Sequence, residues 1–304
     1  MATTGSFRYL DPSTLGNTDS GKPWSKVDVD ATSWKRISIE RPVHDMRAEG
    51  LENFTTDNCG FSVFHHPAAE KDFTDDKAVR GGYYSEVESL LKEKLPAIKK
   101  IVIFDHTIRR RTPDSPRQPV QAVHVDQTPA AAETRLRRHV TDPAEAEELI
   151  KGRYQIINVW RPIGWPASDY PLAVIDWRST EPKDLVAVDL LYPKRQEGED
   201  DDDRGKEVLA DPASLASMEG YEVRGETYAI APNDKHKFYY AKDMTPDEVM
   251  FIKCFDSRSE GRPNGREGLA ALTPHTAFVD PATPPDAKGR QSIEVRCLVF
   301  YDQV

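Results

Sequence analysis

The sequence predicts a mainly β fold, closed as a sandwich or barrel, with a few flanking helices. The first observation is a series of eight short segments rich in β-branched and aromatic residues, separated by turns that contain Pro and Gly. The second is an N-terminal third in which strand-like and helix-like patterns alternate. The third is an apolar run that ends in two polar residues at alternate positions, His124 and Asp126. The eight segments are 154–160, 172–177, 185–192, 221–231, 237–241, 248–255, 276–279 and 292–301.

The chain is expected to begin with an extended arm and to continue into one large domain. Residues 1–35 are rich in Ser, Thr, Asp and Gly and show little periodicity, whereas 36–304 has no linker that divides it. One or two strands are expected over 36–66, and another over 101–104. We therefore divide the chain into an arm, 1–35, and a single domain, 36–304.

Two helices are expected. Apolar residues recur at helical spacing over 85–100, with Pro96 near the end. In the second helix, which ends near residue 151, Asp142 is the expected N-cap and Pro143 the first helical residue. The acidic run 197–203 lacks the glycine and the ligand spacing of a calcium loop, so we expect a solvated loop there.

Composition limits the classes of partner. A chain of 304 residues, 38% of them hydrophobic, can bury a sizeable core. The net charge of -10 argues against nucleic acid and anionic membranes as partners. No apolar run approaches the roughly 18 residues of a membrane span, and residues 1–21 lack the apolar region of a signal peptide. The chain has only three cysteines, so a reducing, cytoplasmic environment is expected. The protein is expected to be a monomer or a homodimer.

The His-x-Asp motif predicts a metal site. Residues two apart in a strand point to the same face, so the imidazole of His124 and the carboxylate of Asp126 aim at a common point. Two histidines and one carboxylate on one side of a metal leave the opposite positions open, as in non-haem Fe(II) oxygenases. The motif also arises by chance, and a polar end of a surface strand is the alternative.

A third ligand is expected near the end of the chain, as in a double-stranded β-helix. His275 is preferred because it begins the penultimate predicted strand. His236, one strand earlier, is the alternative ligand. Otherwise we expect His236 to be hydrogen-bonded at the edge of an aromatic cluster or to line the pocket.

Several polar residues are candidates for binding the carboxylate of a co-substrate or for supporting the metal ligands from behind. A guanidinium grips a carboxylate with two hydrogen bonds, and Arg290 and Arg296 lie at or near the strand that follows His275. Asn158 and Arg161, on the strand at 154–160 and just after it, are further candidates, with a surface ion pair as the alternative for Arg161. One or two of the arginines at 109–111 can also neutralise such a carboxylate, unless they form a solvated basic turn.

Six motifs in this order resemble a known family, which includes the AsaB-type hydroxylase/desaturases, gibberellin GA4 desaturase and the cephamycin methoxylation protein CmcJ. The resemblance runs from about residue 35 to the C-terminus. Near His236 the sequence departs from the family pattern, because Lys237 and Phe238 follow where the family has Arg or Glu and then Trp. The motifs are DHTIRR at 105–110, HVDQT at 124–128, INVWRP at 157–162, the segment 247–257, PHTAF at 274–278 and SIEVR at 292–296.

The resemblance implies a non-haem iron enzyme of secondary metabolism on a double-stranded β-helix, a jelly-roll core of the cupin type. It implies His124, Asp126 and His275 as ligands of Fe(II), with 2-oxoglutarate and O2 as the other cofactors. The implied reaction is hydroxylation, desaturation or oxidative cyclisation at a C–H bond of a small organic substrate. The departure near His236 means that the substrate does not carry over from the family.

Three other functions are compatible with parts of the sequence. An isomerase or oxidase that uses iron without 2-oxoglutarate would keep the three ligands, and the absence of succinate release would distinguish it. A non-catalytic cupin-like binding protein would be expected to lose the metal ligands. A zinc hydrolase is disfavoured because the chain has no His-Glu-x-x-His motif.

Overall fold

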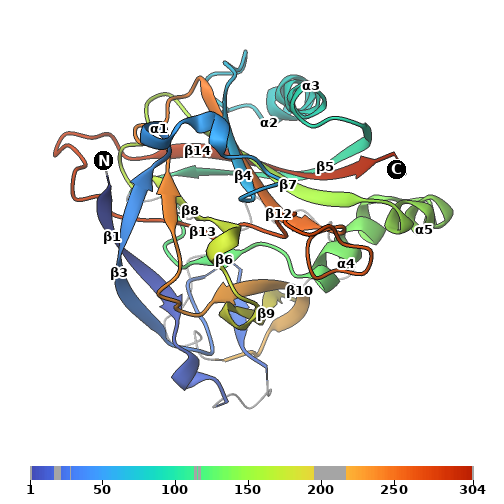
Figure 1. Cartoon of the computed structure of the whole chain (residues 1–304), viewed down its shortest axis with the longest axis horizontal. Coiled ribbons are helices and arrows are strands. Elements are labelled where there is room, and N and C mark those ends of the chain that lie inside the picture. Colours follow the sequence, from blue (N-terminus) through green and yellow to red (C-terminus); the bar gives the residue numbers. More distant parts are fainter. Residues whose placement is uncertain are drawn as a thin grey trace.

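The computed structural model describes residues 2–16, 22–27, 29–112, 115, 118–194 and 217–302. Within these ranges the chain forms a nine-stranded and a five-stranded sheet that face each other, with helices outside (Figure 1). The predicted mainly β fold with flanking helices is confirmed. The acidic run 197–203 lies outside the described residues.

The nine-stranded sheet holds the His-x-Asp motif. Neighbouring strands are antiparallel, except for the parallel pairs β3–β11 and β2–β9. In order across the sheet, the strands are β1 (Thr3–Leu10), β3 (Arg36–Asp45), β11 (Phe238–Tyr240), β8 (Leu172–Ile175), β13 (His275–Ala277), β6 (His124–Val125), β10 (Tyr221–Ile230), β9 (Leu185–Pro193) and β2 (Trp24–Lys26).

The N-terminal residues expected to form an arm contribute both edge strands of this sheet. β1 pairs with β3 along its whole length, and β2 pairs with β9. Alternate residues of β1 are buried, and the ring of Phe7 stacks on that of Phe238 with 3.7 Å between centroids. This period-two burial fixes β1 in the sheet. The division into arm and domain at residue 35 stays a prediction.

The five-stranded sheet is antiparallel throughout and buries both faces. On β7, Ile157 and Val159 pack toward the outer face, under α3 (Tyr84–Lys94), whereas Ile156 and Trp160 pack inward, against the large sheet. In order across the sheet, the strands are β4 (Phe61–His65), β12 (Glu248–Asp256), β7 (Tyr154–Pro162), β14 (Gln291–Tyr301) and β5 (Ile98–Arg110).

The helices follow their local signals. α5 (Pro143–Lys151) begins as predicted, with the Asp142 side chain accepting from the amide of Ala144. The sequence interpretation missed α4 (Pro129–His139), although Thr128 caps it and Pro129 occupies its first turn. α3 is shorter than predicted, because Pro96 follows its end and β5 begins at Ile98. The remaining α-helices of the described residues are α1 (Met46–Glu49) and α2 (Asp76–Ala78), and a π-helix, η3 (Val79–Tyr83), joins α2 to α3. No helix among the described residues is long and apolar enough to cross a membrane.

A β-bulge in β5 decides which residues face the space between the sheets. Arg296 pairs with Asp105 and Cys297 with Ile103, so Phe104 is an extra residue. A bulge of one residue reverses the facing of the residues beyond it. Before Phe104 the odd-numbered Ile103 packs in the outer cluster, whereas after it the odd-numbered Thr107 and Arg109 line an inner pocket.

A buried ion cluster supports the segment that leads to His275. Lys253 Nζ lies 2.9 Å from Asp256 Oδ2, and both side chains are fully buried. Lys253 also donates to the carbonyl oxygen of Ala270 at 3.0 Å. Arg153 donates to the same carboxylate at 2.7 Å. The cluster therefore anchors β12 to the chain that precedes β13.

We predict that Asp256→Asn lowers the free energy of unfolding by about 3–5 kcal/mol, because it leaves the buried Lys253 ammonium without its nearest carboxylate. The measurement is urea denaturation at pH 7. Glu147→Gln is the control, because it removes a solvent-exposed partner of Arg137 and should change little. Equal stability losses in the two variants would contradict the prediction.

The stability difference between wild type and Asp256→Asn should also depend on pH. Burial opposes ionisation of Asp256, but Lys253 and Arg153 hold its pKa below the usual 3.8. A lowered pKa contributes stability that is present above pH 3.8 and is lost as pH falls through the lowered value. Denaturation curves from pH 7 down to pH 3 should show the difference shrinking below about pH 4; a constant difference would contradict this.

Candidate active site

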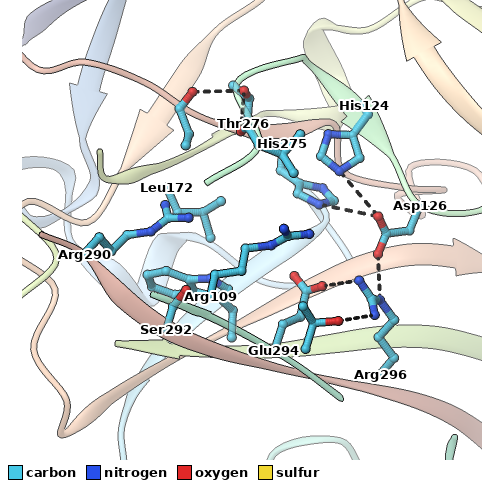
Figure 2. A pocket seen from close by; sticks show the side chains of 14 residues that line it. Arg109, His124, Asp126, Leu172, His275, Thr276, Arg290, Ser292, Glu294 and Arg296 are labelled. Atoms are coloured by element: carbon cyan, nitrogen blue, oxygen red, sulfur yellow. Dashed lines mark hydrogen bonds and ion pairs between the residues drawn. The ribbon is translucent and has the colours of Figure 1, made fainter. Parts of the chain in front are cut away.

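Three potential metal ligands converge between the sheets. β6 and β13 are neighbours, and His124 pairs directly with His275. Asp126 follows β6, and one donor atom from each of the three residues lies within 4.8 Å of the others. Asp126 Oδ1 lies 3.4 Å from His124 Nε2 and 4.0 Å from His275 Nε2. Figure 2 shows both imidazoles pointing toward the carboxylate.

The backbone selects the tautomer of each histidine. His124 Nδ1 lies 2.8 Å from the carbonyl oxygen of Ala122, and His275 Nδ1 lies 3.0 Å from that of Thr273. A carbonyl only accepts, so each Nδ1 carries a proton and each neutral ring presents an Nε2 lone pair. Burial and the neighbouring His124 lower the pKa of His275, which favours its neutral form. Two lone pairs and a carboxylate oxygen facing one another fit a divalent cation.

The Asp126 carboxylate is held by its second oxygen. Oδ2 accepts hydrogen bonds from Asn158 Nδ2 at 2.8 Å and from Arg296 Nε at 3.0 Å. Burial opposes ionisation, but the positive charge of Arg296 holds the pKa of Asp126 well below 3.8. Asp126 is thus an ionised carboxylate whose Oδ1 faces the histidines.

Arg296 is committed to protein groups. Its Nη1 contacts Asp105 Oδ1 at 3.2 Å and Thr107 Oγ1 at 3.0 Å, and its Nη2 lies 2.8 Å from Glu294 Oε1. Burial disfavours the charge, but the surrounding carboxylates, Asp105 first, raise the pKa of Arg296 well above its usual value. The structure places Arg296 beside Asp126, with the carboxylates of Asp105 and Glu294 on its other side.

The other predicted arginine of this region, Arg290, lines the pocket next to the three ligands. Its Nη1 donates to the carbonyl oxygen of Tyr170 at 2.6 Å, and its guanidinium lies over the ring of Trp160. Among the described residues its buried Nε has no hydrogen-bond partner. Burial and the charge of Arg109 lower the pKa of Arg290, so an anion in the pocket would stabilise its charged form.

Arg109 and Ser292 complete this part of the pocket. Ser292 lies two residues after Arg290 on the same face of the chain, a signal that the sequence interpretation overlooked. Arg109 reaches into the pocket in Figure 2 and donates to the carbonyl oxygen of Gln118 at 3.1 Å. The pocket is lined by Thr107, Arg109, Val120, His124, Asp126, Trp160, Leu172, His275, Thr276, Ala277, Arg290, Ser292, Glu294 and Arg296.

Arg161 is not brought to the pocket. Its side chain donates to Tyr83 Oη at 3.0 Å and to the carbonyl oxygen of Pro246 at 2.7 Å, on the outer face of β7. Arg161 is only 1% exposed, so it does not form the surface ion pair that was the alternative prediction for this residue.

His236 lies in a separate buried group. Its Nδ1 is 3.1 Å from Tyr9 Oη and its Nε2 is 3.1 Å from Asp184 Oδ2. Both ring nitrogens are therefore used by side chains, as in the hydrogen-bonded alternative that the sequence left open.

Comparisons with known proteins agree with this geometry. The family model described as an oxidoreductase/YMDC permease-like domain matches residues 7–300. The hydroxylase/desaturase efuI of Hormonema carpetanum is 32% identical over 290 residues, which cover 90% of this chain and 88% of that protein. The Fe(II)/2-oxoglutarate-dependent dioxygenase nvfI of Aspergillus novofumigatus is 30% identical over 264 residues, covering 84% and 81%.

The fold is shared with a solved structure. The iron and alpha-ketoglutarate-dependent endoperoxidase NvfI superposes with a TM-score of 0.74 over 99% of both chains, at 24% identity. This likeness confirms the predicted jelly-roll core. From the family match and the sequence identities, the chain belongs to the hydroxylase/desaturase family of oxidoreductases.

Proposed function

We propose that the chain is an Fe(II)- and 2-oxoglutarate-dependent dioxygenase and that His124, Asp126 and His275 hold the iron. The convergence of two unprotonated Nε2 atoms and one carboxylate oxygen carries this proposal. The names of relatives such as nvfI support the choice of iron and 2-oxoglutarate. The proposed reaction is hydroxylation, desaturation or oxidative cyclisation at a C–H bond of a small secondary metabolite.

The pocket offers an anion site for 2-oxoglutarate. Among the described residues the buried Nε of Arg290 has no hydrogen-bond partner, and Arg290 is close enough to Arg109 for the two charges to interact. Ser292 lies beside Arg290 on the pocket wall and supplies a hydroxyl. We assign the distal carboxylate of 2-oxoglutarate to Arg290 and Ser292, with Arg109 adding positive charge.

The residues of the chain position the reactants and exclude water. When bound, Fe(II) with 2-oxoglutarate and O2 supplies the oxidising power that an unactivated C–H bond requires. Val120, Leu172 and Ala277 form apolar parts of the wall, which limits the access of water to the reacting groups. The position of a substrate C–H bond against this wall then selects the product.

The proposal includes a cytoplasmic location and a monomeric or homodimeric state, without nucleic acid or membrane partners. All three cysteines are free and buried, which suits a reducing compartment. The net charge of -10 disfavours anionic partners.

The first test is anaerobic titration of the metal-free protein with Fe(II) and 2-oxoglutarate, following the weak visible charge-transfer band of the chelate. We expect the band in wild type and in His236→Ala, and its loss in His124→Ala and His275→Ala. His236→Ala is the matched control, because it removes a buried histidine whose two nitrogens are engaged elsewhere.

Two outcomes would contradict the assignment. A band that is lost in His236→Ala but kept in His275→Ala would move the third ligand to His236. Iron binding without a band at any 2-oxoglutarate concentration, and turnover without succinate, would favour an iron enzyme that does not use 2-oxoglutarate.

The anion site is tested with Arg290→Gln. Loss of a charge-assisted hydrogen bond should weaken 2-oxoglutarate binding about 10- to 100-fold at saturating Fe(II). Arg161→Gln is the control, because its buried guanidinium faces away from the pocket, and it should leave the 2-oxoglutarate Kd unchanged. A weaker Kd in Arg161→Gln alone would reverse the assignment of the two arginines.

A further inference from the structure

We propose that Arg296 and Asn158 are positioning residues that hold Asp126 so that one oxygen, Oδ1, binds the metal. This inference rests on the proposed function, because it assumes a metal at the three ligands. Of the two roles that the sequence left open for these residues, support of the metal ligands or binding of the co-substrate carboxylate, it favours the first.

Both donors select the same carboxylate oxygen. Asn158 Nδ2 and Arg296 Nε lie 2.8 and 3.0 Å from Asp126 Oδ2. The other oxygen, Oδ1, is the one that faces the histidine nitrogens, at 3.4 and 4.0 Å. A carboxylate held at one oxygen by two donors presents the other oxygen in a fixed direction, which favours coordination through a single oxygen.

The two donors form a cross-strand pair on the opposite sheet. Arg296 on β14 is the register partner of Asn158 on β7, so both side chains meet Asp126 from one place on the five-stranded sheet. The two histidines, in contrast, belong to neighbouring strands of the nine-stranded sheet. Asp126 is therefore the ligand whose orientation depends on contacts between the two sheets.

Arg296 is itself fixed in place. Its Nη1 reaches Asp105 and Thr107, and its Nη2 reaches Glu294. Together with the contact from Nε, these contacts direct four of the five N–H groups of a guanidinium to protein oxygens. Little hydrogen-bonding capacity remains for a co-substrate carboxylate.

The hydrogen bond from Asn158 to Asp126 leaves the other end of the Asn158 amide, its Oδ1, without a partner among the described residues. The side chain of Asn158 is fully buried. An unpaired buried carbonyl is unfavourable, and rotating the amide would place that oxygen against the ionised carboxylate. The observed orientation is explained by the hydrogen bond from Nδ2 to Asp126.

The test measures metal and 2-oxoglutarate binding separately. Arg296→Gln and Asn158→Ala should each weaken Co(II) or Fe(II) binding about 10- to 100-fold. The d–d absorption bands of bound Co(II) should change, because Asp126 is free to bind through both oxygens or to turn away. The 2-oxoglutarate Kd, measured at saturating metal, should stay at the wild-type value. Arg296→Lys, which keeps the charge but not the Nε donor, should give an intermediate metal affinity.

Two controls separate positioning from a general loss of stability. Arg153→Gln removes a partner of the buried Asp256 in the same sheet, and it should lower the thermal midpoint while leaving metal affinity and the Co(II) spectrum unchanged. Arg290→Gln should give the opposite pattern to Arg296→Gln, with a weaker 2-oxoglutarate Kd and normal metal affinity.

The outcomes distinguish this inference from the proposed function. Wild-type metal affinity and an unchanged Co(II) spectrum in both Arg296→Gln and Asn158→Ala would overturn the inference alone. The same holds if Arg296→Gln weakens 2-oxoglutarate binding without affecting the metal. Metal binding by wild type that survives in His124→Ala would overturn the proposed metal centre, and the positioning roles with it.

Discussion

The geometry of the candidate site depends on the hydrogen bonds that Asp126 accepts from the opposite sheet. His124 and His275 are fixed by strand pairing and by backbone carbonyls within the nine-stranded sheet. Asp126 follows the strand of His124, but Asn158 and Arg296 hold its carboxylate from the five-stranded sheet. A shared apolar core sets the distance between the sheets. Packing far from the site therefore fixes the position of Asp126.

Charge balance explains why so many ionisable side chains can be buried here. Three arginines (Arg109, Arg290 and Arg296) and three carboxylates (Asp105, Asp126 and Glu294) lie in or beside the pocket. Fe(II) and the 2-oxoglutarate dianion carry opposite charges of equal size, so loading both cofactors leaves this balance unchanged. Burial then does not create an uncompensated charge, which would be costly in a low-dielectric interior. The arginines are not equivalent, because Arg296 is surrounded by carboxylates whereas Arg290 faces Arg109.

Sequence patterns predicted the class of fold, most strands and the cluster of His124, Asp126 and His275, but not the roles of the surrounding polar residues. Asn158 and Arg161 are three positions apart on one strand, so they face opposite sides, and strand periodicity alone allowed only one of them into the pocket. Strand periodicity did not predict that Arg109 faces the pocket, because the bulge at Phe104 reverses which residues of β5 face inward. The bulge depends on pairing with β14, which the sequence of β5 does not reveal. The alternation of Phe7 and Tyr9 in β1 was visible in the sequence and was overlooked.

The contrast between His275 and His236 shows what the sequence lacked when it left the third ligand open. Both are buried histidines beside a strand, and burial lowers the pKa of each. Asp184 can only accept when ionised, so His236 donates through Nε2 and accepts at Nδ1 from Tyr9, leaving no lone pair for a metal. His275 uses Nδ1 for a backbone carbonyl and keeps the Nε2 lone pair directed at the other two ligands. A histidine is thus suited to bind a metal by the nitrogen that its neighbours leave unused, and those neighbours come from distant parts of the chain.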